Sequence, residues 1–264
     1  MAIHATAVVD PAAELGDVEV GPFAVIGAGV TLEDGVRVGS HAVLQGTLSV
    51  GGGTVIHPHA VVGGDPQDLK YDGEASSLIL GRDNIIREYV TLNRGTAKGG
   101  GVTRIGSGNL FMANSHVGHD CVVGDNCVLA NSVALGGHVQ VGDGAVLGGL
   151  AGVHQHARIG RYAMVGAGAM VSLDVPPFCM AQGDRARLFG LNVIGLRRAG
   201  MGADLLKELR AAYRELFRSS TPLRMAAERL ATENPEHSEI LEIVRFIEES
   251  QRGVCRASAD PEGR

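Results

Sequence analysis

The chain has 264 residues, of which 45% are hydrophobic and only 4% aromatic, with 39 glycines and no tryptophan. This composition can form a hydrophobic core, and its low aromatic and high glycine content favours a thin solenoid over a packed sandwich. The formal net charge of −6 argues against a general nucleic-acid-binding protein.

The sequence shows neither a signal peptide nor a transmembrane segment. The start, MAIHATAVVDPAAELG, lacks a basic region followed by a long apolar core, and no apolar run approaches the roughly 20 residues that span a bilayer. We therefore expect a cytoplasmic protein. Its four cysteines have no CxxC spacing, and Cys121 and Cys127 are expected to be small core residues rather than a redox pair.

An apolar residue recurs every six positions from Ile3 to Val62, except for one turn of five residues between Leu15 and Val20. A period of six is neither the 3.6-residue period of a helix nor the simple alternation of a strand. It is typical of a parallel β-helix, in which each group of six forms one face of a three-sided coil.

Two stretches interrupt the repeat and are predicted to be loops that leave the coil. The first, near 63–77, contains Pro66 and several charged residues. The second, near 94–104, reads RGTAKGGGVTR. Loops on a regular scaffold often carry function, so both are candidates for substrate contacts.

The longest unbroken run of the repeat spans 105–175. Its first positions are all apolar, its second positions are often Gly, and its fifth positions are small. The first-position side chains are expected to fill the coil, and the glycines to serve where the backbone turns. Pro176 and Pro177 cannot continue a hydrogen-bonded ladder. The sequence therefore predicts a β-helix over 1–177.

Helical periodicity begins after an arginine-rich connector at 178–200. The helical domain is predicted over 201–264, with one apolar face from Leu205 to Phe217, a helix start at Pro222 and a break at Pro235. We expect these helices to cap one end of the coil and to cover its strand edges. The polar tail after Gly253 is expected to be mobile.

Polar residues of three coils meet at one corner if each coil contains three groups of six. Residues 18 apart then stack in columns, about 4.8 Å between neighbouring strands. Each histidine alone is more simply explained as a solvated corner residue, but the group predicts a functional site. The columns are His119, Gly137 and Gln155; Asp120, His138 and His156; and Gly118, Gly136 and His154, with His116 just before them.

This cluster predicts acyl transfer. An imidazole can take a proton from a hydroxyl as that hydroxyl attacks a carbonyl carbon. Asp120 could hold or charge-stabilise such a base, and the amides of Gly136 and Gly137 could stabilise an oxyanion. Neither a GxSxG motif nor a catalytic cysteine signature is present in the sequence. We therefore expect direct attack by the acceptor, without an acyl-enzyme.

Several motifs resemble those of the bacterial UDP-N-acetylglucosamine acyltransferases that begin lipid A synthesis. They are PQDLKYDGE, IREYVTLNRGT with KGGG, NSHVGHDCVVG, VHQHARIG, DVPPF and AQGDRARLFGLN, followed by a three-helix tail. The resemblance implies an all-β solenoid, a left-handed parallel β-helix with a C-terminal α-helical domain, although parallel crossovers are usually right-handed. It also implies a homotrimer with active sites between subunits.

The resemblance further implies transfer of a (R)-3-hydroxyacyl group from acyl carrier protein to the 3-position of UDP-N-acetylglucosamine. It implies no metal and no resident cofactor, since 4'-phosphopantetheine arrives on the carrier protein. That protein is acidic, so its docking surface should be basic. Candidate docking residues are Arg82, Arg87, Arg94, Lys98 and Arg104.

Individual roles are carried over from the matching motifs. His119 resembles the general base, Asp120 its partner and Gly137 the oxyanion-binding amide, while Ala167 resembles the residue that limits acyl-chain length. The chain departs from the family pattern at Ile194, where an acidic residue is common, and at Ala199, where an arginine is common. Residues that resemble those holding the nucleotide sugar or the acyl group are Gln67, Asp68, Lys70, His116, His138, His154, Gln155, Asn192 and Arg198.

Other functions are compatible with parts of the sequence. Zinc-dependent γ-type carbonic anhydrases use the same coil and bind the metal through histidines of adjacent turns and subunits. A non-catalytic scaffold would leave the polar columns unexplained. The related UDP-3-O-acylglucosamine N-acyltransferase usually has an additional N-terminal domain, whereas this chain enters its repeats at Ile3. The sequence leaves open the acyl length and whether the acceptor carries a 3-hydroxyl or a 3-amino group.

Overall fold

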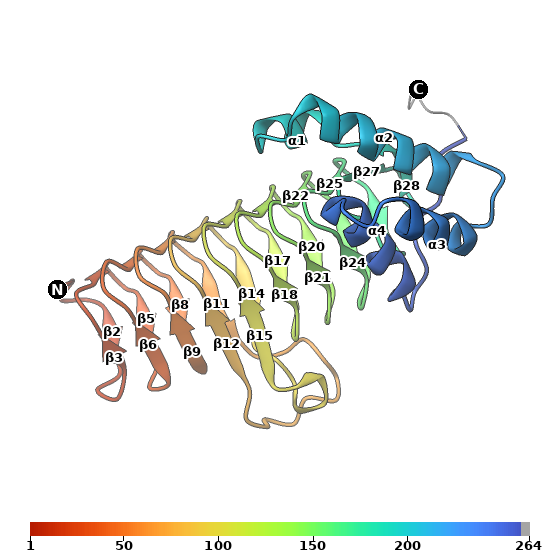
Figure 1. Cartoon of the computed structure of the whole chain (residues 1–264). Coiled ribbons are helices and arrows are strands. Elements are labelled where there is room, and N and C mark those ends of the chain that lie inside the picture. Colours follow the sequence, from red (N-terminus) through yellow and green to blue (C-terminus); the bar gives the residue numbers. More distant parts are fainter. Residues whose placement is uncertain (260–264) are drawn as a thin grey trace.

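The computed structural model describes residues 1–259 and shows three β-sheets wound into one long coil (Figure 1). Neighbouring strands within each sheet are three apart in chain order along the coil, because each turn contributes one strand to each of three faces. These coil strands all pair in parallel, which confirms the predicted β-helix.

The sheets are named A, B and C. Sheet A contains β1 (Ala2–Ile3), β4 (Glu19–Val20), β7 (Arg37–Val38), β10 (Val55–Ile56), β13 (Ile85–Ile86), β16 (Leu110–Phe111), β19 (Val128–Leu129), β22 (Val146–Leu147), β25 (Met164–Val165), β27 (Cys179–Gln182) and β28 (Arg187–Leu191). Sheet B contains β2 (Val8–Val9), β5 (Val25–Ile26), β8 (Val43–Leu44), β11 (Val61–Gly64), β14 (Thr91–Asn93), β17 (His116–Val117), β20 (Ala134–Leu135), β23 (Gly152–Val153) and β26 (Met170–Val171). Sheet C contains β3 (Glu14–Leu15), β6 (Val30–Leu32), β9 (Thr47–Val50), β12 (Ser77–Leu80), β15 (Val102–Ile105), β18 (Val122–Val123), β21 (Gln140–Val141) and β24 (Arg158–Ile159).

Most strands are two residues long, and they alternate outward and inward side chains. In β20, for example, Ala134 is exposed and Leu135 is buried. The small fifth-position residues are also buried, including the free thiols of Cys121 and Cys127. Burial raises the pKa of both thiols to about 12. Both cysteines are therefore neutral core residues, as predicted from their spacing.

The chain turns between sheets at three corners, named A–B, B–C and C–A. Many corner residues have a left-handed backbone, such as Asp120 (φ 59°) and His138 (φ 62°) at the B–C corner. Asn, Asp and His adopt this conformation more readily than most residues, which suits them to these positions. A stack of four rings on the A–B corner comprises Phe23, His41, His59 and Tyr89, with successive centroids 5.0 Å apart.

Regular coils pair residues 18 apart, such as Leu110 with Val128. The five-residue turn shortens the first coil, so that Ala2 pairs with Glu19. The two excursions span 65–76 and 94–101, and both leave the coil between sheets B and C (Figure 1). The second is shorter than the expected 94–104, because Val102–Ile105 pairs with Ser77–Leu80.

The connector, for which the sequence predicted no secondary structure, contains both strands and a helix. It forms an antiparallel hairpin of β27 and β28, followed by helix α1 (Val193–Arg198). Helices α2 (Ala203–Arg218), α3 (Leu223–Glu233) and α4 (Ser238–Glu248) then lie at the C-terminal end of the coil (Figure 1). Pro222 caps α3, and α4 begins after Pro235, as expected.

The first residues after Gly253 are ordered against the end of the coil. Val254 forms a β-bridge with Asp174, and Ala257 forms one with Leu188, so this segment returns to the end of the coil. The rest of the predicted mobile tail, 260–264, lies outside the described residues. Within 1–259, the helices are too short or too polar to cross a bilayer.

Two arginines of the coil anchor helix α4 to sheet C. Arg161 pairs with Glu242 at 2.7 Å. Arg158 pairs with the buried carboxylate of Asp174 at 3.0 Å, and its guanidinium lies 4.1 Å from the ring centroid of Phe246. These contacts fix the helical cap against the last coils, where the cleft described below ends.

Candidate active site

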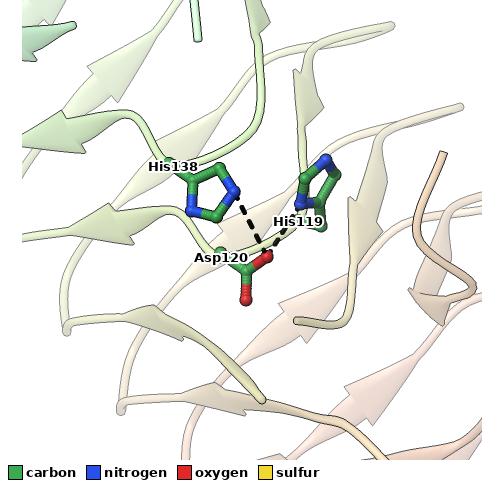
Figure 2. A group of neighbouring side chains, drawn as sticks. All are labelled: His119, Asp120 and His138. Carbon is green, nitrogen blue, oxygen red and sulfur yellow. Dashed lines mark hydrogen bonds and ion pairs between the residues drawn. The ribbon is translucent and has the colours of Figure 1, made fainter. Parts of the chain in front are cut away.

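His119 and Asp120 lie at the B–C corner, directly after β17 and Gly118. Side chains of consecutive residues in an extended strand point apart. The left-handed backbone of Asp120 removes this constraint, and His119 Nδ1 lies 2.8 Å from Asp120 Oδ2 (Figure 2). The contact between the two candidate catalytic side chains therefore exists within one corner of one chain.

The Asp120 carboxylate is almost completely buried, with 1% of its side chain exposed. Its oxygens accept hydrogen bonds from the Thr96 backbone N–H at 2.8 Å and the Thr96 hydroxyl at 2.7 Å. Burial alone would raise the pKa of Asp120, but the hydrogen bonds from His119 and Thr96, together with nearby His138, outweigh burial and lower it. Asp120 is therefore ionised at neutral pH.

Thr96 was not singled out from the sequence as a site residue. It lies in the second excursion, and periodicity cannot place a loop residue against a particular coil. Its hydroxyl also accepts a hydrogen bond from the Gly99 N–H at 3.2 Å. A Cβ on Gly99 would lie 2.0 Å from the Asp120 Cγ, so the KGGG segment needs a glycine here. The excursion thus closes over the carboxylate.

Gly137 lies beside His119, one coil further along, as the column prediction requires. A Cβ on Gly137 would lie 2.5 Å from His119 Cε1 and 2.6 Å from its Nε2. Within residues 1–259, the Gly137 N–H donates no hydrogen bond. The glycine therefore leaves room for the imidazole and keeps an uncommitted backbone donor next to it.

A cleft of about 680 Å³ runs along sheet B from this corner. It brings together six residues predicted for the site, whereas Asp120 lies behind His119. His116 Nδ1 lies 2.7 Å from the Thr91 hydroxyl, and burial lowers the pKa of His116. The six predicted residues in the cleft wall are Gln67, His116, His119, Gly137, His154 and Gln155.

His138 belongs to the same corner but does not line the cleft. Its Nε2 lies 3.7 Å from Asp120 Oδ2 (Figure 2). Its ring stacks on His156 with centroids 4.4 Å apart and meets the His119 ring edge-on. Burial lowers the pKa of His138, and the nearby Asp120 carboxylate only partly opposes this effect. His138 is therefore a neutral neighbour of the His119–Asp120 pair.

The first excursion contributes one residue, Gln67, to the cleft. Asp68 accepts a hydrogen bond from the Lys70 backbone N–H at 3.0 Å, which turns the loop, and Lys70 is exposed. Arg94 holds the loop against the coil through an ion pair with Asp65 and a hydrogen bond to the Tyr71 hydroxyl. Asp68 and Lys70 are not part of the cleft wall.

Three predicted residues lie away from the cleft of their own chain. Asn192 is buried, where it caps α1 through the Gly195 N–H at 3.1 Å and donates to the Tyr162 carbonyl at 3.0 Å. Arg198 is exposed in the last turn of α1. Ala167 is exposed at the A–B corner, on the opposite edge of sheet B from His119. A single chain therefore does not unite all the predicted substrate contacts.

The candidate carrier-protein residues are unequally available. Arg82 pairs with Glu33, Arg87 with Glu88 and Arg94 with Asp65. Of the five arginines and lysines considered, only Lys98 and Arg104 make no ion pair within 1–259.

His119, Asp120 and His138 are also the described residues that could together hold a metal ion, because their ligand atoms lie within 4.8 Å of one another. However, His119 Nδ1 and Asp120 Oδ2 are already at hydrogen-bonding distance from each other. Both Asp120 oxygens also accept hydrogen bonds from Thr96. Zinc ligation would have to replace these bonds. The arrangement is that of an imidazole oriented by a carboxylate.

Comparisons with known proteins agree over almost the whole chain. The family described as Udp N-acetylglucosamine O-acyltransferase, domain 2, matches residues 174–255, and the bacterial transferase hexapeptide family matches 103–137. A relative from Myxococcus xanthus, named acyl-[acyl-carrier-protein]–UDP-N-acetylglucosamine O-acyltransferase, is 51% identical over 255 residues, covering 96% of this chain and 99% of its own. A relative of the same name from Thermodesulfovibrio yellowstonii is 43% identical over 255 residues, with the same coverage.

Solved structures agree with these relatives. A crystal structure of a UDP-N-acetylglucosamine acyltransferase is 43% identical with a TM-score of 0.95, covering 98% of this chain and 100% of the other. The UDP-N-acetylglucosamine acyltransferase from Campylobacter jejuni is 36% identical with a TM-score of 0.92, covering 97% and 100%. The coil is accordingly left-handed, as the motifs implied, and neither a carbonic anhydrase nor an N-acyltransferase is favoured.

Proposed function

The chain belongs to the acyl-[acyl-carrier-protein]–UDP-N-acetylglucosamine O-acyltransferases, and from this premise we propose how its residues carry out the reaction. The enzyme transfers an acyl group from acyl carrier protein to UDP-N-acetylglucosamine, in the first step of lipid A biosynthesis. The group transferred is a (R)-3-hydroxyacyl chain, and its acceptor is the 3-hydroxyl of the sugar.

His119 is the general base. Because the Asp120 carboxylate is ionised, its 2.8 Å contact with His119 requires a proton on Nδ1. The lone pair of the neutral imidazole is then on Nε2, which faces Gly137 and the cleft. Nε2 takes the proton of the sugar hydroxyl as its oxygen attacks the thioester carbonyl. Asp120 stabilises the imidazolium that forms.

The Gly137 N–H stabilises the tetrahedral oxyanion. As the intermediate collapses, the bond between carbon and sulfur breaks, and the phosphopantetheine sulfur takes the proton from the imidazolium and leaves as the thiol of the carrier protein. No acyl-enzyme forms. Burial raises the pKa of Cys121 to about 12, and its Sγ donates to the Gly136 carbonyl, so the nearest cysteine is not a thiolate nucleophile.

The proposal depends on one observation, the His119–Asp120 hydrogen bond at the mouth of a cleft. It is tested by incubating the purified full-length chain with UDP-N-acetylglucosamine and hydroxyacyl carrier proteins, and identifying the product by mass spectrometry. A product acylated at the 3-hydroxyl, formed by metal-free protein, supports the proposal. Loss of activity with chelator and recovery with zinc, or an acylated form of the enzyme, would contradict it.

We also propose that three copies assemble around the A–B corner. The outward side chains of sheet A are apolar along β10, β13, β16, β19, β22 and β25, whereas those of sheet C include Arg104, Gln140 and Arg158. Phe23, Tyr89 and Leu150 are exposed at the A–B corner. An exposed apolar surface of this extent favours burial against another protein surface. If sheet A of one copy contacts a different face of the next copy, the contacts can close a ring.

This assembly would bring sheet A of one copy toward the cleft of the next. It accounts for the position of Ala167, Asn192 and Arg198 outside the cleft of their own chain. Light scattering coupled to size-exclusion chromatography should give three times the chain mass of 27.4 kDa. A monomer that is fully active at low concentration would contradict intersubunit sites.

We place the reaction in the cytoplasm, where carrier proteins and nucleotide sugars are made, and cell fractionation tests this location.

A further inference from the structure

The floor of the cleft is formed by one outward-facing column of sheet B. In this column His116 pairs with Ala134, Ala134 with Gly152, and Gly152 with Met170. All four residues line the cleft. Ala134 and Gly152 have short side chains or none, so the middle of the column is a trough. Larger side chains, His116 and Met170, bound it at its two ends.

Met170 fills the end of the trough that is further from His119. Its Sδ would lie only 3.0 Å from a Cβ on Gly152, so the thioether folds back over the glycine of the neighbouring strand. The residue is nevertheless 46% exposed, and the exposed part contributes to the cleft wall. An unbranched thioether is apolar and flexible, which suits contact with a hydrocarbon chain.

The backbone of Met170 is held firmly. Its N–H donates to the Gly183 carbonyl at 3.1 Å, and its carbonyl accepts from the Ala186 N–H at 2.9 Å. These bonds attach β26 to the turn between β27 and β28. Beyond Met170 the cleft wall becomes polar, with Asp184 and Arg185. An apolar chain lying in the trough therefore meets a fixed thioether and then charged groups.

The distance between Met170 and Gly137, where the acyl carbonyl would lie, is that of a short hydrocarbon segment. Gly137 follows β20 and Met170 belongs to β26, two strands further along sheet B. With about 4.8 Å between neighbouring strands, the column rises about 10 Å between them. An acyl chain whose carbonyl lies at Gly137 can follow the trough past Ala134 and meet the Met170 thioether where it folds over Gly152.

We infer that Met170 is a specificity-determining residue that sets the far limit of the acyl trough and thereby the longest chain transferred. The inference rests on the proposed function, since it requires an acyl group at Gly137. It differs from the expectation for Ala167, which does not line this cleft and lies at the other edge of the sheet. Ala167 would reach the chain only from a neighbouring copy.

The test is a competition assay with the full-length enzyme. Equal amounts of carrier proteins bearing hydroxyacyl chains that increase by two carbons are supplied together, and the products are quantified by mass spectrometry. Met170→Ala removes the thioether and should favour chains longer than the wild-type optimum by at least 10-fold, since one methylene in an apolar pocket changes selectivity by about 10- to 200-fold. Met170→Phe should shift the optimum toward shorter chains. The control is Met225→Ala, a similarly exposed methionine on α3, which should leave the profile unchanged.

Outcomes that overturn the inference are distinct from failure of the proposed function. An active wild-type enzyme whose chain-length profile is the same in Met170→Ala and Met170→Phe would remove Met170 from chain selection. A raised KM for UDP-N-acetylglucosamine with an unchanged profile would assign Met170 to the nucleotide sugar instead. If the folded wild-type protein transferred no hydroxyacyl chain of any length, the proposed function itself would fail.

Discussion

His119 Nδ1 and Asp120 Oδ2 are 2.8 Å apart although the two residues are consecutive in the chain. The left-handed φ of Asp120 makes this contact possible, and Thr96 holds the carboxylate from the other side. Orientation of the base is therefore built into a single turn of the backbone. The coils on either side support this turn, because Thr96 holds the carboxylate and Gly137 makes room for the ring.

Replacing either member of this pair should reduce turnover without unfolding the protein. His119→Ala should lower kcat by about 10²- to 10⁴-fold, the usual effect of losing a general base. Asp120→Asn should lower it by about 10²-fold or more, because the correct imidazole tautomer is no longer enforced. His156→Gln is the matched control at the same corner and should retain activity within about twofold. Steady-state rates near wild type for His119→Ala would exclude the proposed base.

Gly137→Ala should inactivate the enzyme through its effect on His119. The new Cβ would lie 2.5 Å from His119 Cε1, so the imidazole must move. Because a side chain rather than the backbone is displaced, we expect kcat to fall at least about 10²-fold while the thermal midpoint changes little. Gly27→Ala is a suitable control within the coil, because its Cβ would make only an ordinary van der Waals contact, 3.5 Å from the Leu44 carbonyl oxygen. Equal activity of both variants would show that His119 tolerates the displacement.

Stability should fall as the pH is lowered below about 6.5. Burial lowers the pKa of His116 and of His138 in the folded protein, so below about 6.5 the unfolded chain binds protons that the folded chain does not. Each such group can contribute up to about 1.4 kcal/mol per pH unit, in the window between its unfolded and folded pKa. Urea unfolding at pH 7.5 and 5.5 should show a smaller loss for His116→Gln than for wild type. The exposed residue His4 provides the control variant, His4→Gln; if it and His116→Gln gave the same loss, the assignment would be wrong.

Arg158→Met should strongly destabilise the junction between the coil and its helical cap. The Asp174 side chain is 1% exposed and would lose its ion pair. Removing one partner of a buried pair typically costs about 3–5 kcal/mol. The hydrogen bonds that remain, from the Ser250 hydroxyl and the residue 158 backbone N–H, place the expected loss near the lower value. Glu249→Gln removes the other partner of Arg158, which is 69% exposed, and should cost less than about 1 kcal/mol. Chemical denaturation of both variants measures the difference.

Ala167→Met should shift acyl preference toward shorter chains if neighbouring copies share the site. Ala167 lies at the A–B corner, which the proposed trimer brings toward the cleft of an adjacent copy. A longer side chain would shorten the space available to the acyl group from that side. The same competition assay reports the effect, with light scattering to verify the trimer. An unchanged profile in an intact trimer would exclude Ala167 from the acyl site.

The repeat made most of the coil predictable from sequence. Once residues 18 apart are known to be neighbours, the proximity of His119 and Gly137 follows from counting, as does the contact between His138 and His156. Apolar first positions also predicted which side chains are buried, because each inward position faces the same kind of environment in every coil.

Features outside the repeat could not be obtained by counting. Thr96 reaches Asp120 from an excursion whose path depends on tertiary contacts, and the KGGG segment gave no indication of which coil it covers. The pairing of Val254 with Asp174 joins segments with no shared pattern. Met170 stood in an ordinary outward position, and only its fold over Gly152 distinguishes it.

The pairing of residues 18 apart also restricts how chains of this fold can change in length. A whole turn can be gained or lost while every later side chain keeps its face, whereas a change of one or two residues within a strand would rotate all that follows. The two excursions at the B–C corner cause no such rotation, because residues 65–76 and 94–101 leave the coil and return to it at the same point of its circumference. Insertions in such enzymes are therefore expected to accumulate at the corners, while the three-sided coil itself stays unchanged.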